Sequence, residues 1–197
     1  MLINFNEAKH EYSLDGEIIP GVTTIINDLY TPGPDDEAME IARDRGTKVH
    51  KACELYDLNV LDLEDLDPVL QPYLNAWIQF RSDTGVSIIE IERLVYHPKF
   101  RYAGKLDRVA MLNGKISVID IKSSTVMLKL TGLQLAAYQA AYNASIAGTD
   151  LPEATERYGL QLRADGKYRL VPYTDKTEFN VFIGCLNRYN WRLKYAK

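Results

Sequence analysis

The sequence predicts a single α/β domain that spans residues 1–197 and is built on one mixed sheet with helices on its faces. Segments with helical periodicity alternate with strand-like segments along the chain, in the order helix, three antiparallel strands, helix, strand. At least one central strand is apolar on both faces, as strands of a buried sheet are. A chain of 197 residues is also long enough to bury roughly 70% of the surface it exposes when unfolded.

Residues 1–35 are expected to form a hairpin region that precedes the core. Residues 9–19 alternate between polar and apolar side chains and contain Asp15-Gly16, a pair typical of tight turns. The segment PGVTT that follows is expected to be a loop. Nothing in this region indicates chemistry.

The predicted catalytic core covers about residues 36–147 and begins with two helices. The first is expected over about 36–56, with Gly46 as a point where it could break. Its predicted buried residues are Ile41, Val49, Ala52, Cys53 and Tyr56. An acidic surface connection leads to a second helix from Pro68 to about Thr84. Its predicted buried residues are Leu70, Tyr73, Trp77 and Phe80.

The sheet is expected to come from strand-like segments at 86–96, 102–111 and 115–123, followed by an alanine-rich helix over about 130–147. Two further strands, 158–164 and 167–173, are predicted to meet at Asp165-Gly166. A basic helix over about 175–195 completes the C-terminal part, 157–197.

Composition excludes several classes of protein. Hydrophobic residues make up 46% of the chain and charged residues 25%, which is ordinary for a soluble globular protein. No apolar run reaches the roughly 18 residues of a membrane span, and the N-terminus does not resemble a signal peptide, so a cytoplasmic protein is expected. Cys53 and Cys185 lie far apart and are predicted to be buried thiols, which excludes a zinc site and a four-cysteine iron–sulfur cluster.

The net charge of −4 argues weakly against a nucleic-acid-binding protein. Its distribution matters more, because residues 157–197 contain nine basic and three acidic side chains. This basic region either binds phosphates or is a solvated surface.

The pair Asn-Gly at 113–114 lies between two apolar segments and predicts a β-hairpin, because both of its residues tolerate positive φ. Counting outward from this turn, Asp107 faces Asp120 and Lys105 faces Lys122. The period of two along a strand places all four side chains on one face of the sheet. The hairpin therefore predicts a cluster of charges at one end of two neighbouring strands.

Directly opposed carboxylates repel each other, so Asp107 and Asp120 need positive charge beside them. A divalent cation would supply it, and carboxylate ligands suit Mg²⁺ or Mn²⁺ better than zinc. In the alternative without metal, Lys105 and Lys122 neutralise the two carboxylates in a buried ion network.

Three further features of the core are candidates for the same site. Glu90 and Glu92 share one face of the preceding strand, and periodicity does not decide which of them points inward. His50, in RGTKVH, is either a ligand or a packing residue of the first helix. Arg43 and Arg45 are either solvated or bind phosphate.

The helix after the hairpin carries a polar stripe with a spacing of four residues. Gln134, Tyr138 and Tyr142 form this stripe, and alanines fill the neighbouring face. The stripe is either an exposed polar edge or a face that the helix turns toward the charged cluster.

Together these motifs resemble the PD-(D/E)xK nuclease superfamily, whose signature is an acidic residue, an Asp and a (D/E)xK triplet on adjacent strands. Here the signature reads Glu92, then GKLDR, then IDIK, over about residues 20–145. The segments RGTKVH and QLAAYQAAY resemble the helix histidine and QxxxY motif of the RecB-like branch, which includes phage recombination exonucleases of the RecE and lambda-exonuclease type.

The resemblance implies a restriction-endonuclease-like αβββαβ core and a role for each matching residue. His50, Asp107, Asp120 and the carbonyl of Ile121 would bind metal, Lys122 would be the catalytic lysine, and Glu92 would be the first acidic residue. Gln134 and Tyr138 would lie near the active site or DNA, and Arg43, Arg45 and Lys105 are further candidates for DNA binding. The bound metal would activate water for phosphodiester hydrolysis.

The implied function is a Mg²⁺- or Mn²⁺-dependent exonuclease that acts at DNA ends in recombination, repair or phage DNA processing. The resemblance implies bacterial, phage or prophage origin, a single-strand annealing or other recombination protein as a partner, and a homo-oligomer, since related exonucleases include rings. A structure-specific endonuclease and a non-catalytic nucleic-acid-binding module are the alternatives.

Overall fold

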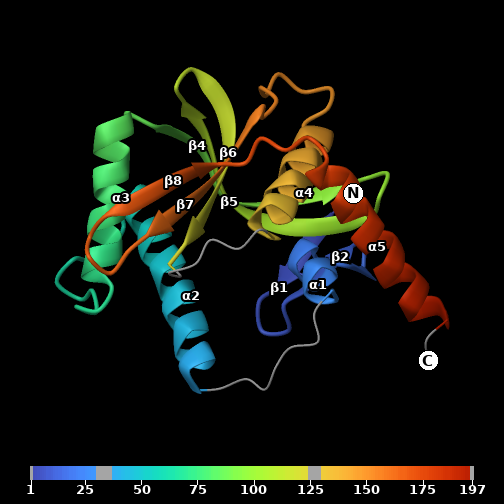
Figure 1. The fold of residues 1–197 in the computed structure, drawn as a ribbon, viewed down its shortest axis with the longest axis horizontal. Coiled ribbons are helices and arrows are strands. Elements are labelled where there is room, and N and C mark those ends of the chain that lie inside the picture. The colour runs from blue at the N-terminus through green and yellow to red at the C-terminus, as the bar shows by residue number, and fades with distance from the viewer. Residues whose placement is uncertain (1, 30–36, 124–129, 196–197) are drawn as a thin grey trace.

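A computed structural model describes residues 2–29, 37–123 and 130–195, and a five-stranded mixed sheet forms its centre (Figure 1). The strands lie in the order β4-β5-β6-β7-β8. Only β6 and β7 run parallel to each other, and the other neighbours are antiparallel. The strands are β4 (Ser87–His97), β5 (Tyr102–Leu112), β6 (Lys115–Lys122), β7 (Glu156–Leu162) and β8 (Tyr168–Pro172). The predicted mixed sheet is therefore confirmed.

Helices cover both faces of this sheet (Figure 1). On one face, Trp77 and Phe80 pack in a buried cluster with Ile119. On the other, Tyr142 and Phe182 pack in a buried cluster with strand residues of β5 and β6. The first face is covered by α2 (Glu37–Asp57) and α3 (Gln71–Thr84), and the second by α1 (Val22–Asn27), α4 (Leu130–Ser145) and α5 (Glu178–Tyr195). The predicted order of core elements is confirmed.

The Asn-Gly turn sets the register of β5 and β6 as predicted. Asn113 and Gly114 have φ angles of 51° and 74°, and Leu112 pairs with Lys115. Pairing continues outward to Arg108 and Ile119 and ends there. The predicted register is therefore confirmed up to Arg108–Ile119, and Asp107 and Asp120 are the next residues in that register, one step beyond the last pair.

The N-terminal region contains more structure than expected. The predicted hairpin forms, with positive φ at both residues of its Asp15-Gly16 turn, but a third strand precedes it and pairs through Phe5 and Tyr12. The three antiparallel strands are β1 (Ile3–Asn6), β2 (Glu11–Leu14) and β3 (Glu17–Ile19). The segment PGVTT was wrongly expected to be a loop, because its last three residues begin α1.

Two expectations for α2 are also wrong. Ile41 is 57% exposed, and the helix continues through Gly46 without a break. The first half of α2 extends beyond the sheet (Figure 1), so the described strands offer Ile41 no surface to pack against. The second half meets the core, where Val49, Ala52 and Cys53 are buried as predicted.

Two predictions about buried residues are confirmed, although α3 begins at Gln71 rather than at Pro68. The expected inner face of α3 is buried in full, and both cysteines are buried free thiols. Among the described residues, none of the helices combines the length and hydropathy needed to cross a membrane.

Candidate active site

Three acidic residues lie on neighbouring strands at one end of the central sheet, which are Glu92 on β4, Asp107 on β5 and Asp120 on β6. The pairing of β4 with β5 runs on both sides of Glu92 and Asp107 but skips them, from Ile91–Arg108 to Arg93–Leu106. Glu92 also has a left-handed backbone, with φ of 49°. The backbone is therefore irregular at Glu92, although the register of β4 against β5 is the same on both sides of it and shifts only between Ile88 and Glu90.

This local geometry distinguishes the two glutamates that the sequence left open. Glu90 pairs with Arg93 three residues away, whereas Glu92 lines a cleft together with His50. Glu92 is therefore the glutamate of β4 that joins the acidic cluster.

His50, Glu92 and Asp107 each offer one ligand atom, and these atoms lie within 4.8 Å of one another. His50 Nδ1 lies 3.3 Å from Asp107 Oδ1. The second carboxylate oxygen of Asp107 accepts a hydrogen bond of 2.6 Å from the backbone N–H of Ile121. Two carboxylates and an imidazole that converge in this way fit a divalent cation.

Electrostatics supports the same conclusion. Burial by itself raises the pKa of Asp107, but His50, Lys122 and the Ile121 amide together lower it to about 2. Burial and the nearby charge of Asp107 raise the pKa of Glu92. Positive neighbours therefore keep Asp107 ionised, and it is Glu92 whose charged form is disfavoured by Asp107, a repulsion that a bound cation would relieve.

Asp120 lies beside this cluster and has a different partner. Lys122 Nζ is 2.7 Å from Asp120 Oδ2 and donates a hydrogen bond of 3.1 Å to Gln134 Oε1. Gln134 Nε2 in turn donates to the hydroxyl of Tyr138 at 3.2 Å. Burial raises the pKa of Asp120, and Lys122 opposes this shift. The structure thus joins the triplet of β6 to the predicted polar stripe of α4.

The geometric cluster therefore differs in part from the predicted ligand set. It contains His50 and Asp107, adds Glu92, and leaves Asp120 with Lys122. The contact recorded for Ile121 here involves its amide, so its carbonyl stays a predicted ligand.

The stripe of α4 is not an exposed edge. Tyr138 and Tyr142 are buried and Gln134 is half-buried, which excludes that alternative.

A buried arginine that the sequence analysis did not single out contacts the carboxylate of Glu92. Arg108, which has no exposed surface, lies 3.0 Å from Glu92 Oε1 and 2.8 Å from Asp57 Oδ2. Its guanidinium lies over the ring of Trp77, whose Nε1 also donates to Asp57. Arg81 completes the network with a contact of 2.8 Å to Asp57. The motif GKLDR could have indicated this arginine. Successive side chains on a strand point to opposite faces, so the residue after Asp107 points to the other, buried face of the sheet, where a charge needs a partner.

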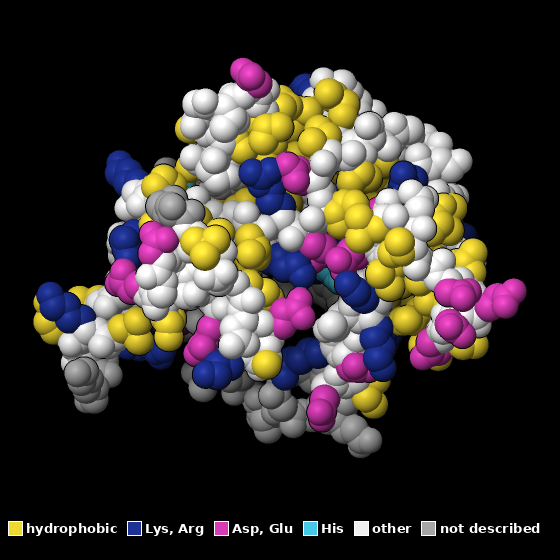
Figure 2. Space-filling view, turned by 180° about the vertical axis from the view of Figure 1, so that it is seen from behind, with side chains coloured by type: hydrophobic (Ala, Val, Ile, Leu, Met, Phe, Trp, Pro, Cys, Tyr) yellow, Lys and Arg dark blue, Asp and Glu magenta, His cyan; other side chains and the backbone are white. Residues whose placement is uncertain are grey.

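The cluster opens into a cleft of about 810 Å³ between α2, the central sheet, α4 and the N-terminal sheet. Figure 2 shows acidic and basic side chains around a hollow on this face, with a histidine partly visible inside it. Predicted residues that line the cleft are Arg43, His50, Glu92, Lys105, Lys122 and Tyr138. Residues of the N-terminal sheet also line it, which are Phe5, Glu7, His10 and Tyr12.

Two predicted DNA-binding residues have other surroundings than expected. Arg45 does not line the cleft, and its guanidinium lies 5.8 Å from the centre of the Tyr73 ring. Lys105 does not pair with Lys122 across the ladder. Its Nζ lies 3.1 Å from Glu92 Oε2 instead.

Three arginines of the basic C-terminal region are engaged within the molecule. Arg188 and Arg192 contact Asp28, and Arg157 contacts Glu178 at 2.9 Å. These contacts fasten α5 to the body of the protein, so this region is not one uninterrupted basic surface.

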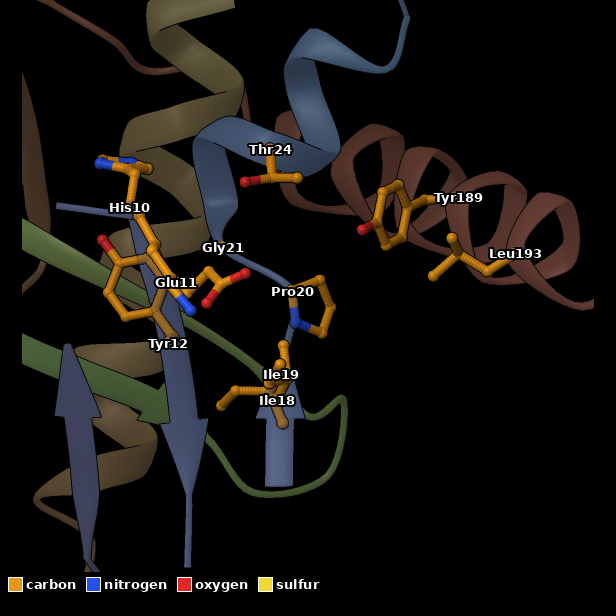
Figure 3. A pocket seen from close by; sticks show the side chains of 11 residues that line it. His10, Glu11, Tyr12, Ile18, Ile19, Pro20, Gly21, Thr24, Tyr189 and Leu193 are labelled. Atoms are coloured by element: carbon orange, nitrogen blue, oxygen red, sulfur yellow. The ribbon is translucent and has the colours of Figure 1, made fainter. Parts of the chain in front are cut away.

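A second cavity, of about 310 Å³, lies between the N-terminal sheet and α5 (Figure 3). Ile18 and Ile19 face it from β3, and Tyr189 and Leu193 from α5. None of the predicted site residues lines it.

The solved structures that match this chain are distant from it. They include the protein SSO0001 (15% identity, 88% of this chain and 89% of that chain, TM-score 0.37). An alkaline exonuclease from Laribacter hongkongensis, LHK-Exo, has 14% identity over 88% and 90% of the two chains, with a TM-score of 0.35. The same protein in complex with dAMP has 14% identity over 90% and 93%, with a TM-score of 0.35. These similarities are too weak to bear on activity, and no curated protein matches the chain.

The family comparison is more informative. The sequence pattern of the PD-(D/E)XK nuclease superfamily matches residues 61–178, which is more than half of the chain. The match includes Glu92, Asp107, Asp120 and Lys122, while His50 precedes it. The mixed sheet between helices is consistent with the restriction-endonuclease-like fold that the sequence predicts. The chain therefore belongs to the PD-(D/E)XK nuclease superfamily.

Proposed function

We propose that this nuclease hydrolyses DNA phosphodiester bonds with Mg²⁺ or Mn²⁺ and acts at DNA ends, as a member of the RecB-like branch. The observation that carries the proposal is the convergence of His50, Glu92 and Asp107 beside the Asp120–Lys122 pair in one cleft. Action at ends, rather than at internal bonds, is supported by the sequence resemblance alone.

The proposed roles follow from the contacts. His50, Glu92 and Asp107 hold the cation, and Asp120 is a further ligand by its place in the family motif. A bound divalent cation lowers the pKa of water and offsets charge on the scissile phosphate. The imidazole of His50 favours Mn²⁺ relative to a site made only of oxygen ligands.

Lys122 is proposed to act on the attacking water and on the charge that develops on phosphorus. Its ammonium group is already directed by Asp120 Oδ2 and Gln134 Oε1, so little reorganisation is needed when substrate binds. Asp120→Ala or Lys122→Ala should lower cleavage of linear DNA by at least about 100-fold. Undiminished cleavage by both folded variants would refute the proposed chemistry.

Metal binding can be tested without any substrate. Mn²⁺ at about 100 times its Kd should stabilise the folded protein by about 2.7 kcal/mol, which raises Tm by about 5 to 11 °C. His50→Gln should reduce this shift. His97→Gln is the matched control, because His97 packs against Phe100 and Tyr102 away from the cluster. An equal Mn²⁺ shift in wild type and His50→Gln would exclude His50 as a ligand.

Action at ends can be tested with end-labelled linear DNA and closed circular DNA in the presence of Mg²⁺. An exonuclease degrades the linear substrate and leaves the circle intact. Cutting of the circle would instead establish a structure-specific endonuclease, and binding without cleavage of either substrate would establish a non-catalytic module.

A further inference from the structure

The N-terminal sheet is fastened to the catalytic strand β5, so it forms a fixed wall of the cleft. The backbone N–H of Ala103 donates a hydrogen bond of 3.0 Å to the carbonyl of Pro20. Tyr12 is buried, and the backbone of Lys105 forms a hydrogen bond with its side chain. A Cβ at Gly21 would lie 2.8 Å from the Tyr12 ring, so only glycine allows the chain to pass this closely.

Phe5 presents an aromatic ring on this wall. Its ring is stacked on Tyr12, with centroids 4.6 Å apart and planes 28° apart. The exposed ring of His10 meets it edge-on, at 5.2 Å and 88°. Phe5 is half-buried and lines the cleft. Tyr12 thus supports the Phe5 ring from within the protein.

A short path of contacts leads from this ring to the metal cluster. Phe5 stacks on Tyr12, whose side chain bonds to the backbone of Lys105. Lys105 Nζ lies 3.1 Å from Glu92 Oε2, and Glu92 is a member of the cluster. The cleft therefore presents the Phe5 ring first, then Lys105, and then the His50–Glu92–Asp107 cluster.

The charge and size of the cleft indicate what would occupy it. Its basic lining residues are Arg43, Lys51, Lys105 and Lys122. Its acidic lining residues are Glu7, Glu54 and Glu92, and two of them pair with lining lysines, Glu54 with Lys51 at 2.8 Å and Glu92 with Lys105. The lining therefore carries four basic side chains against three carboxylates. A volume of about 810 Å³ falls in the range of roughly 300 to 1,000 Å³ that encloses one small ligand. Cations beside an aromatic platform are the combination that binds single-stranded nucleic acid.

The second cavity is smaller and offers fewer cations beside its aromatic residues. Lys9 is its only basic lining side chain apart from His10, and its volume is about 310 Å³ (Figure 3). The catalytic cleft is therefore the better place for a nucleotide.

We propose that Phe5, with His10 at its edge, stacks on the terminal base of a single DNA strand whose phosphate lies at the His50–Glu92–Asp107 cluster. This inference rests on the proposed function and adds a substrate class to it, the unpaired end of a strand. Phe5 is a binding residue in this scheme, and its effect falls on substrate binding and KM rather than on kcat.

The test compares Phe5→Leu, which keeps apolar packing but loses the aromatic face, with Phe5→Trp, which keeps it. Binding of short oligothymidylate is measured in a Lys122→Ala background with Mg²⁺, and KM and kcat are measured in the active protein. Phe5→Leu should raise Kd and KM by about 5- to 150-fold, the effect of one lost base stack. Phe5→Trp should restore both. Trp191→Leu is the control, because Trp191 is 61% exposed on α5 and does not line the cleft.

A second substrate distinguishes base stacking on Phe5 from a purely structural role of this residue. An oligothymidylate with an abasic terminal residue should bind wild type more weakly, and Phe5→Leu should weaken its binding no further. A Phe5→Leu protein with unchanged Kd and KM for the intact strand would overturn the inference, and so would an equal loss on the abasic strand. Either result leaves the proposed function standing, since that depends on whether Lys122→Ala abolishes cleavage.

Discussion

Glu92 of the central sheet and Glu7, which directly follows β1, line the same cleft but are held differently. Glu92 contacts Arg108, which is completely buried and fixed by Asp57. Glu7, on the opposite wall, has a side chain that is 81% exposed, and its closest recorded cation is Lys105 at 3.9 Å. We infer that the carboxylate of the metal cluster is held in one position by a buried ion network. The exposed carboxylate of Glu7 is free of such a network and can adapt to substrate. Three substitutions test this contrast.

The largest effect is expected at Arg108. Arg108→Met leaves the buried carboxylates of Asp57 and Glu92 without a main partner, which should cost about 3 to 5 kcal/mol of stability. For a chain of this size that corresponds to a fall in Tm of about 6 to 20 °C, measurable by thermal melting. Arg163→Met is the matched control, because the Arg163–Asp165 pair is exposed on both sides and contributes at most about 1 kcal/mol. Similar losses in the two variants would remove the distinction between buried and exposed ion pairs.

An intermediate effect is expected at Gln134. Gln134→Leu removes the oxygen that accepts a hydrogen bond from Lys122, so kcat should fall about 10- to 100-fold, as for other groups that orient active-site residues. KM should change little, because Gln134 does not line the cleft.

Gln139→Leu provides the control for that measurement. Gln139 lies on the same helix and donates to the carbonyl of Ala154, away from Lys122. A kcat for Gln134→Leu equal to that of Gln139→Leu would show that the support of Lys122 by α4 is not needed.

The smallest effect is expected on the N-terminal wall, and it has the opposite sign. Glu7→Gln removes an exposed negative charge from the cleft, so single-stranded DNA should bind about 1.5- to 5-fold more tightly, as expected for about 0.2 to 1 kcal/mol. The gain should shrink as salt is added. Glu11→Gln is the control, since Glu11 is exposed on the same sheet but lines the other cavity. Weaker binding by Glu7→Gln would mean that this carboxylate contributes to binding.

The sequence was sufficient for the parts of the site that depend on local rules. The Asn-Gly turn fixes the register of β5 and β6 because its positive φ angles permit a tight hairpin. Helical spacing likewise places Gln134 and Tyr138 on one side of α4, where Gln134 accepts a hydrogen bond from Lys122 and donates one to Tyr138. Both features need only a few neighbouring residues.

Other parts depend on contacts between distant segments. Arg108 and Asp57 form their ion pair although they are 51 positions apart in the sequence. The sequence around either residue therefore does not indicate its partner. The convergence of Glu92 and Asp107 depends on the register of β4 against β5, which shifts between Ile88 and Glu90, and no local sequence rule indicates that shift. Ile41 fits an apolar helical stripe, but the stripe does not reveal that this end of α2 extends past the sheet.

The left-handed backbone of Glu92 sets a limit on how this protein can evolve. A non-glycine residue in that conformation carries about 1 to 3 kcal/mol of strain, which the surrounding contacts must offset. Glycine or asparagine would fit the same φ of 49° with less strain, yet either would remove the carboxylate from the cluster. Selection for stability and selection for activity therefore oppose each other at this one position, and a lineage that lost the activity would be free to replace the glutamate.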